Sequence, residues 1–360
     1  MRLLLVIAAL RSGGAERIVV RLAADAAARG DTVTVASAGG AWVEQVLATG
    51  GTHATVPLGR RSTLATIAAV RPLAAVAREF QPDLVHAHNV RAALAATLAL
   101  ARPPARRRRR PALLTTVHGL AEADYPAAVR LLRRCGGTVI ACAPAVGRAL
   151  LDAGLPPHRL DVVINGVAVR RPSEADLAGA RRRFGIGDRP LVLGLGRLVE
   201  QKAWPTLIEA ARRIEGADVL VAGDGPLRGE LEAAAAAGGG RVRFAGQVDD
   251  PAALLGLARC VVSTSSWEGL PLALLEALTQ GVPVVATAVG GNVDLPADAV
   301  ILVPPGDPAA VAAAVDRVLH APGLAERLAR AGRAAAASWS LDRMLGAYRE
   351  RYLAAVNGRP

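Results

Sequence analysis

Short apolar runs alternate with segments of helical pattern along the whole chain. The runs are apolar throughout instead of alternating with polar residues, which is typical of parallel strands covered on both faces by helices. In the first half, strands are expected at residues 3–8, 32–37, 54–58, 83–87, 113–117 and 137–142, with helices at 15–28 and 64–80. In the second half, strands are expected at 190–195, 218–222, 242–244, 260–264, 282–286 and 300–303.

The alternation stops once, near the middle of the chain. Asn165 and Gly166 form a turn signal, and residues 168–188 are charged and irregular, which predicts a linker. The sequence therefore predicts an α/β protein with two doubly wound, Rossmann-like domains, at 1–168 and 169–340. Ligands of such sheets bind beyond the carboxyl ends of the strands, so we expect the two domains to face each other across a binding cleft.

Charge is distributed unevenly between the two halves. Residues 1–169 hold 21 arginines and 10 acidic residues, a net charge of +11, whereas residues 170–360 carry a net charge of +1. Six arginines fall at 102–110 among prolines, which predicts a loop that is either solvated or in contact with an anionic membrane surface. Nucleic acid is disfavoured as a partner, because aromatic residues make up only 3% and no recognition motif is present.

The cysteines and the lengths of the apolar runs indicate the cellular compartment of the protein. Cys135, Cys142 and Cys260 show no metal-ligand spacing and fit a reduced cytoplasm. No apolar run reaches the roughly 18 residues needed to span a bilayer. The apolar run after Met1 leads into a turn without a small-residue cleavage site, which favours a buried strand over a signal peptide. We therefore expect a cytoplasmic protein, peripheral at the inner membrane face if the arginine loop binds lipid.

Lys202 is the only lysine among 43 basic residues. Because arginine replaces lysine everywhere else, the lysine retained here indicates a site that needs a compact charge. It lies five residues after Arg197, beyond an apolar strand and the turn at Gly196. A glycine-rich turn that opens a helix is suited to hold a phosphate group. Arg197 and Lys202 are therefore candidates to neutralise a diphosphate, and a surface lysine without a function is the alternative.

Two carboxylates flank a second turn of the same kind. Glu268 precedes Gly269 and Leu270, and Pro271 fits the first position of a helix in which Glu276 lies about two turns along. Gly269 and Leu270 would then present unpaired backbone N–H groups to an anion. One carboxylate can meet the sugar end of a ligand, and the other can accept hydrogen bonds from ribose hydroxyls.

The first half of the chain offers polar groups at corresponding places. Gly13 and Gly14 follow the first strand and open a helix, where backbone can approach a phosphate or a sugar closely. His86 and His88 follow one strand and His118 follows the next, so all three are expected at the carboxyl edge of the sheet. His118, beside a glycine, is the strongest candidate of the three for a ligand contact.

Together these motifs resemble the retaining family 4 glycosyltransferases, which have the GT-B fold. The resemblance covers nearly the whole chain, and these segments carry it: Gly13-Gly14-Ala15-Glu16, His118-Gly119, Asn165-Gly166-Val167, Gly196-Arg197-Leu198 with Lys202, Gly223-Asp224-Gly225-Pro226, and Glu268 with Glu276. It implies that the first domain binds an acceptor and the second a nucleotide-sugar donor. It also implies that a C-terminal helix, within 341–360, packs back on the first domain. The family commonly has glycine where this chain has Ala203.

The resemblance also implies a role for each candidate residue. It predicts catalytic roles for His118, Arg197, Lys202 and Glu268, donor contacts for Gly14, Gly196, Gly269, Leu270 and Glu276, and acceptor-side positions for Gly13, His86 and His88. Metal-dependent transferases hold a cation with an Asp-x-Asp triplet, and none occurs in this sequence. We therefore expect no metal and no cofactor, with the charge of the leaving diphosphate stabilised by Arg197 and Lys202.

Two other functions remain open. A nucleotide-sugar epimerase of the same architecture would turn over its substrate without an acceptor, and a non-catalytic binding protein would not turn it over at all. A nicotinamide dehydrogenase is disfavoured, because neither glycine turn completes the dinucleotide fingerprint. The sequence leaves open the acceptor, which is a lipid-linked glycan, a phospholipid or a small metabolite, and the donor, for which a uridine diphosphate sugar is the default.

Overall fold

The structure is a computed structural model that describes residues 1–360 except 12, 60–62, 102–109 and 359–360. The predicted arginine loop at 102–110 therefore lies outside the described residues, apart from Arg110. By its internal contacts the chain divides into two units, Met1–Ile164 together with Asp342–Pro360, and Asn165–Leu341. No helix in the described part of either unit is long and apolar enough to cross a bilayer.

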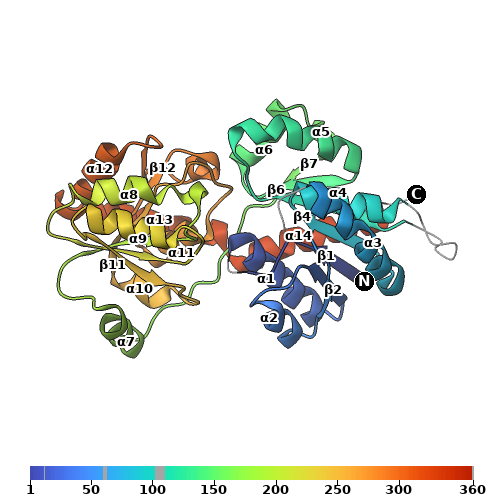
Figure 1. The fold of residues 1–360 in the computed structure, drawn as a ribbon, viewed down its shortest axis with the longest axis horizontal. Helices are drawn as coiled ribbons and strands as arrows, with labels where there is room; N and C mark the ends of the chain where they lie inside the picture. The colour runs from blue at the N-terminus through green and yellow to red at the C-terminus, as the bar shows by residue number, and fades with distance from the viewer. Residues whose placement is uncertain (12, 60–62, 102–109, 359–360) are drawn as a thin grey trace. The chain divides into compact units, whose positions relative to one another are not determined.

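The first unit is built on a parallel sheet with the strand order β3-β2-β1-β4-β5-β6-β7 (Figure 1). Its strands are β1 (Arg2–Val6), β2 (Thr32–Ser37), β3 (Thr52–Thr55), β4 (Leu84–His88), β5 (Ala112–Val117), β6 (Thr138–Ala141) and β7 (Leu160–Val162). Its helices include α1 (Gly14–Ala28), α2 (Val43–Ala48), α3 (Thr63–Phe80), α4 (Val90–Leu100), α5 (Tyr125–Cys135) and α6 (Pro144–Asp152). Leu3, Leu4 and Leu5 of β1 are buried, as expected for a central strand covered on both faces.

Helix α14 (Leu341–Asn357), red in Figure 1, lies among the blue and cyan elements of the first unit. Its buried Tyr352 hydroxyl is 2.7 Å from Nδ1 of His86, and its buried Tyr348 hydroxyl is 3.1 Å from Oγ1 of Thr116. These contacts tie the helix to β4 and β5. The C-terminal segment thus belongs to the core of the first unit, although it follows the second unit along the chain.

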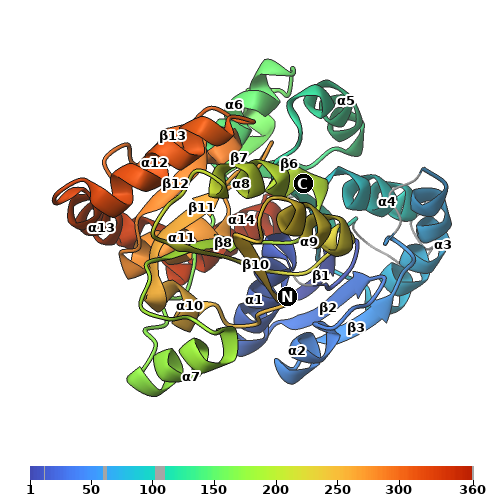
Figure 2. The same cartoon turned by 60° about the vertical axis from the view of Figure 1, so that its left-hand side comes forward.

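The second unit has a parallel sheet with the strand order β10-β9-β8-β11-β12-β13. Its strands are β8 (Leu191–Leu195), β9 (Asp218–Ala222), β10 (Val242–Gly246), β11 (Ala258–Ser263), β12 (Val284–Thr287) and β13 (Val300–Val303). Its helices are α7 (Glu174–Phe184), α8 (Trp204–Ala211), α9 (Arg228–Ala237), α10 (Ala252–Leu257), α11 (Leu272–Gln280), α12 (Pro308–His320) and α13 (Leu324–Ala335). Figure 2 shows α12 beside β12 and β13, where its apolar residues enter the core.

The expected irregular linker at 168–188 is wrong, because helix α7 occupies much of it. Ser173 accepts a hydrogen bond from the backbone N–H of Asp176, and the Asp176 carboxylate accepts one from the N–H of Ser173. This reciprocal cap stabilises a helix whose polar sequence has little apolar periodicity. Strand β7 was also missed, because it is three residues long and polar at Asp161. The other expected strands are present, with ends displaced by a few residues.

Candidate active site

Lys202 forms an ion pair with Glu268, which the sequence also predicted as a site residue. The lysine ends a short 3-10 helix, Glu200–Lys202, and the two side chains are only 16% and 6% exposed. Oε1 of Glu268 also accepts a hydrogen bond from Ser265 Oγ at 2.6 Å, and its Oε2 lies 3.4 Å from Nε2 of Gln201. The only lysine and its partner are thus fixed beyond the carboxyl ends of the adjacent strands β8 and β11.

Arg197 lies in the turn between β8 and Lys202, and its side chain is exposed. Its backbone carbonyl accepts a hydrogen bond from Nε1 of Trp204 at 2.8 Å, and Trp204 is buried, so the indole ring fixes this turn. The guanidinium makes no hydrogen bond or ion pair with any residue that the structure describes. Arg197 therefore offers an unpaired cation close in sequence to the Lys202–Glu268 pair.

Glycine at two positions lets the turns after β8 and β9 pack together. An ideal Cβ on Gly196, which has φ +155°, would lie 3.1 Å from Cε of Lys202. An ideal Cβ on Gly223, which has φ +154°, would lie 1.9 Å from the carbonyl oxygen of Gly196, so any side chain there would collide with backbone. The backbone N–H of Leu198 also donates to the carbonyl of Asp224 at 2.9 Å. The glycine motif at 223–225 thus shapes the turn that carries Arg197.

Ala203 has the left-handed conformation that favours glycine, with φ 46° and ψ 43°. Oγ1 of Thr264 donates to the carbonyls of Lys202 at 3.0 Å and Ala203 at 3.2 Å, which holds this turn against the end of β11. For a residue with a Cβ the left-handed conformation costs roughly 1–2 kcal/mol. The hydrogen bonds from Thr264 therefore hold Ala203 in the left-handed conformation although it is strained.

Ala203→Gly is expected to raise the free energy of unfolding by about 1 kcal/mol or less. The relief of left-handed strain exceeds the extra chain entropy that glycine brings to the unfolded state. The matched control is Ala234→Gly in the exposed middle of α9, where about 1 kcal/mol should be lost. Urea unfolding of both variants measures the difference, and an equal loss in the two would contradict the left-handed backbone at Ala203.

The backbone after Glu268 is anchored by its carbonyls and leaves its N–H groups free. The carbonyl of Gly269 accepts a hydrogen bond from the N–H of Gly291 at 2.6 Å, and that of Leu270 accepts one from Nδ2 of Asn165 at 2.8 Å. The N–H groups of Gly269 and Leu270 donate to no residue in the described part of the chain. They are therefore held in place without a partner from the described chain, and unpaired N–H groups of this kind can bind an anion.

Helix α11 begins at Leu272, one residue later than expected, and Pro271 is its N-cap with φ −67° and ψ 123°. Glu276 is therefore the fifth residue of the helix, one position nearer its start than expected. Its side chain is half-buried. Contact between Glu276 and a ribose stays a prediction.

The glycine turn at Gly13 differs from the turn at Gly269, because the protein's own carboxylate Glu16 lies beside it. Gly13 is the N-cap of α1, which begins at Gly14, while the neighbouring residue 12 is outside the described part. An ideal Cβ on Gly13 would lie 2.3 Å from Oε2 of Glu16, so glycine leaves room for this carboxylate to fold back. A carboxylate of the chain itself thus lies at the start of α1, where a phosphate or a sugar was expected.

The three predicted histidines fall into two groups. His86 is buried, with Nδ1 2.7 Å from the Tyr352 hydroxyl and Nε2 2.8 Å from Oγ1 of Thr116, so both ring nitrogens are engaged within the core. His88 is also buried, and its Nδ1 lies 2.9 Å from Nε2 of the half-buried His118. Burial lowers the pKa of His86 to about 3 and that of His118 to about 4, and holds the pKa of His88 well below its usual value. All three imidazoles are therefore neutral at pH 7.

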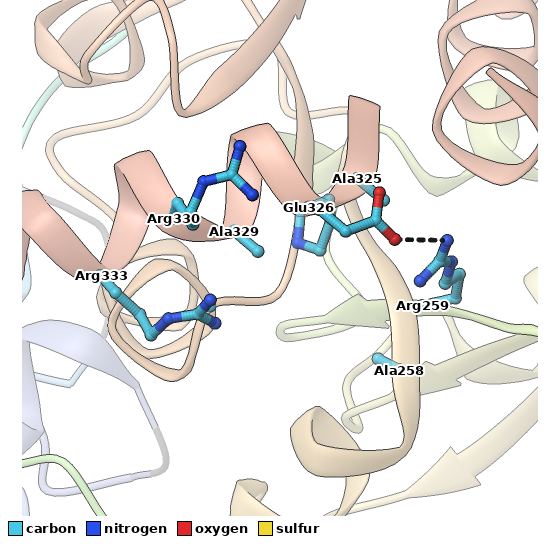
Figure 3. Close-up of a pocket in the computed structure, with 9 residues that line it drawn as sticks. Ala258, Arg259, Ala325, Glu326, Ala329, Arg330 and Arg333 are labelled. Atoms are coloured by element: carbon cyan, nitrogen blue, oxygen red, sulfur yellow. Dashed lines mark ion pairs between the residues drawn. The ribbon is translucent and has the colours of Figure 1, made fainter. Parts of the chain in front are cut away.

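A cavity of about 360 Å³ lies at the other end of the second sheet (Figure 3). Ala258 at the start of β11 and Pro283 just before β12 line it, together with three arginines, Arg259, Arg330 and Arg333. Figure 3 shows Arg259 paired with Glu326, at 3.5 Å, and Arg330 on the helix α13. Because the cavity is at the amino ends of these strands, it is separate from the candidate site around Lys202.

Two family models match consecutive parts of this chain. Residues 12–171 match the model described as Glycosyltransferase Family 4, and residues 180–335 match the model described as Glycosyl transferases group 1. Together they account for most of the chain. The chain belongs to the family 4 glycosyltransferases.

Curated relatives of this chain come from several bacteria. The alpha-D-kanosaminyltransferase of Streptomyces kanamyceticus is 36% identical over 208 residues, which cover 54% of this chain and 54% of the relative. The lipopolysaccharide core biosynthesis glycosyltransferase LpsE of Rhizobium meliloti (strain 1021) is 32% identical over 213 residues, which cover 58% and 61% of the two chains. This chain thus spans little more than half the length of the relatives it matches.

Solved structures show that the chain has the GT-B fold. HepE of Anabaena in complex with UDP and glucose has a TM-score of 0.84 at 22% identity, covering 97% of this chain and 98% of that chain. The sucrose-phosphate synthase of Thermosynechococcus elongatus has a TM-score of 0.81 at 21% identity, covering 99% of each chain. The predicted fold of two Rossmann-like parallel-sheet domains is confirmed.

Proposed function

We propose that this chain transfers a sugar, with retention, from a nucleoside diphosphate donor to an acceptor hydroxyl. The observation that carries the proposal is the fixed Lys202–Glu268 pair near an unpaired Arg197 and the free N–H groups of Gly269 and Leu270. These groups offer two cations and two backbone donors to a diphosphate. Glu268 offers a carboxylate to the hydroxyls of the sugar.

In the proposed reaction, the bond between the anomeric carbon and the β-phosphate oxygen breaks, and its electron pair leaves with the diphosphate. Positive charge develops on the sugar ring while the acceptor oxygen bonds to the same face of the anomeric carbon. The proton of the acceptor hydroxyl passes to the departing phosphate oxygen, so the protein supplies no nucleophile. Arg197 and Lys202 stabilise the negative charge that develops on the leaving group, and such fixed charges are usually the largest catalytic term.

The relatives suggest which substrates to try first. HepE was solved with UDP and glucose, which supports a uridine diphosphate sugar as the donor. A relative named 2-deoxystreptamine glucosyltransferase, from Streptomyces kanamyceticus, supports a small hydroxylated metabolite as acceptor. The relative named for lipopolysaccharide core biosynthesis supports a lipid-linked glycan. We propose the small metabolite as the first acceptor to test.

The function is tested by thermal-shift screening of nucleotide sugars, followed by acceptor trials with the nucleotide sugar that stabilises the protein most. The proposal predicts release of the nucleoside diphosphate only when an acceptor is present, together with a glycosylated product. Release without any acceptor, together with an epimerised free sugar, would indicate an epimerase. Stabilisation without turnover on any acceptor class would indicate a binding protein.

Activity is expected to persist after exhaustive treatment with EDTA, at close to the untreated rate. Arg197 and Lys202 supply the counter-charge for which other transferases use a divalent cation. The measurement is product formation by the EDTA-treated, dialysed enzyme, with and without added Mg²⁺ or Mn²⁺. Complete loss that either cation restores would contradict this account of the leaving-group charge.

We also propose that the first unit binds anionic membrane surfaces. This proposal rests on the net charge of +11 on residues 1–169. Leu64 and Ile67 of α3 are 79% and 57% exposed, which provides apolar side chains that can enter an interface. Each arginine near an anionic surface contributes about 1 kcal/mol, and salt screens this attraction.

Liposome flotation at low and high salt tests the membrane proposal. Binding to anionic vesicles is expected at low salt and should weaken at high salt. It should also weaken when the arginines at 106–110 are replaced by serine. Neutral vesicles are the control. No binding at low salt, or binding unchanged by the serine replacements, would remove the membrane role and leave a solvated loop.

A further inference from the structure

His118 is fixed by two consecutive residues at the end of β4. The ring of His88 lies 2.9 Å from its Nε2, and the side-chain oxygen of Asn89 accepts a hydrogen bond from the His118 backbone N–H at 3.3 Å. The two imidazole planes are nearly parallel, at 12°. The side chain and the backbone of His118 are thus both positioned from the neighbouring strand.

The bond between the two rings allows two arrangements of the protons. Both imidazoles are neutral, so one of the two bridging nitrogens carries a proton and the other accepts it. If His88 Nδ1 donates, then His118 is protonated on Nδ1 and His88 Nε2 is a lone pair. If His118 Nε2 donates, then His88 carries its proton on Nε2.

The environment of His88 Nε2 distinguishes these arrangements. This atom is buried and has no hydrogen-bond partner among the described residues. A buried N–H donor without a partner is rarer in folded proteins than an acceptor with an unused lone pair. The first arrangement leaves only a lone pair unsatisfied at this atom, whereas the second leaves an N–H group. The first is therefore the more stable.

We propose that His88 is a positioning residue that holds His118 in the tautomer protonated on Nδ1. His118 then meets its ligand as a hydrogen-bond donor and not as a base. Its Nδ1 has no partner among the described residues and, unlike Nε2 of His88, is not among their buried unpaired atoms. A ligand that matches it presents an oxygen acceptor, such as a sugar hydroxyl or a phosphate oxygen. This ligand contact rests on the proposed function, whereas the tautomer does not.

Long-range ¹H–¹⁵N correlation of the imidazole rings in ¹⁵N-labelled full-length protein measures the tautomer directly. The His118 signals are assigned as those lost in His118→Gln. We expect Nδ1 of His118 to resonate as a protonated nitrogen and Nε2 as an unprotonated one. The opposite pattern would overturn the proposal, and this result needs no variant of His88 and no activity.

Variants on β4 separate positioning from general packing. His88→Phe removes the donor, so the Nε2 signal of His118 is expected to shift toward the protonated position. Turnover should fall by roughly tenfold to a hundredfold, by analogy with loss of the hydrogen-bond partner of a metal-ligating histidine. His86→Phe, at an equally buried position two residues earlier, should leave the His118 pattern as in the parent protein. A His118 pattern unchanged by His88→Phe would also overturn the proposal.

Titration with a uridine diphosphate sugar completes the test. A change in the His118 Nδ1 signal on saturation is expected if this nitrogen donates to the bound donor. No change, with the Nδ1-protonated pattern present, would leave the tautomer established and contradict the proposed ligand contact. The failure of the proposed function and the failure of the positioning role are thus distinguishable.

Discussion

Lys202→Ala is expected to lower sugar-transfer turnover by on the order of a hundredfold or more, because it removes a fixed charge that acts on the leaving diphosphate. Lys202→Arg should also be impaired, since the planar guanidinium does not fit the enclosed place that the ammonium shares with Glu268 and Ser265. The measurement is acceptor-dependent release of nucleoside diphosphate at saturating donor. Full activity in both variants would contradict the assignment.

A control is needed because the same substitution leaves the buried Glu268 carboxylate without its cation. Circular dichroism and the unfolding midpoint establish whether the variant is folded before its turnover is interpreted. Arg330→Ala removes a cation from the cavity at the opposite end of the same sheet. It is expected to leave turnover unchanged, so a loss of activity in both variants would indicate a non-specific charge effect.

Glu268→Gln is expected to have opposite effects on binding and on turnover. In the free protein Glu268 is paired with Lys202, so a phosphate that binds must compete with this carboxylate for the ammonium. Removing the charge of Glu268 should therefore strengthen binding of the nucleoside diphosphate by on the order of tenfold. Turnover should fall by on the order of a hundredfold, because the carboxylate no longer contacts the sugar as its ring becomes positive. Isothermal titration with UDP and steady-state kinetics measure the two effects.

Glu326→Gln is the matched control for this substitution. It removes the carboxylate of another ion pair in the same unit, with Arg259, where the glutamate side chain is 54% exposed. Neither UDP affinity nor turnover should change. If Glu268→Gln weakens UDP binding in parallel with turnover, then Glu268 supports the diphosphate site instead of competing with it.

The sheets of this protein could be predicted from sequence because their strands are short apolar runs with few polar interruptions. Strand β9 was predicted with its observed ends, since it begins at a charged residue, Asp218, and is followed by a glycine. Helix α7 could not be predicted from apolar periodicity, because only Ala180 in it is buried. Its signal was the capping pair of Ser173 and Asp176, which is local hydrogen-bond chemistry and not a hydrophobic pattern.

Individual residues of the candidate site could be predicted from the sequence, but the contacts between them could not. The scarcity of lysine singled out Lys202, and the turn at Gly269 singled out Glu268, but their pairing depends on β8 and β11 being adjacent in the sheet. Separation along the chain does not reveal such neighbours. The bond between His88 and His118 was likewise hidden, since it joins the ends of β4 and β5. Trp204, which fixes the turn of Arg197, gave no signal beyond its apolar character.

The most direct test of the central claim is a crystal structure of the protein with bound UDP. The account predicts that the diphosphate contacts Arg197, Lys202 and the backbone N–H groups of Gly269 and Leu270. It also predicts that the Lys202–Glu268 pair opens or lengthens as the phosphate binds. UDP bound elsewhere, for example against Arg330 and Arg333 in the cavity of Figure 3, would contradict the account.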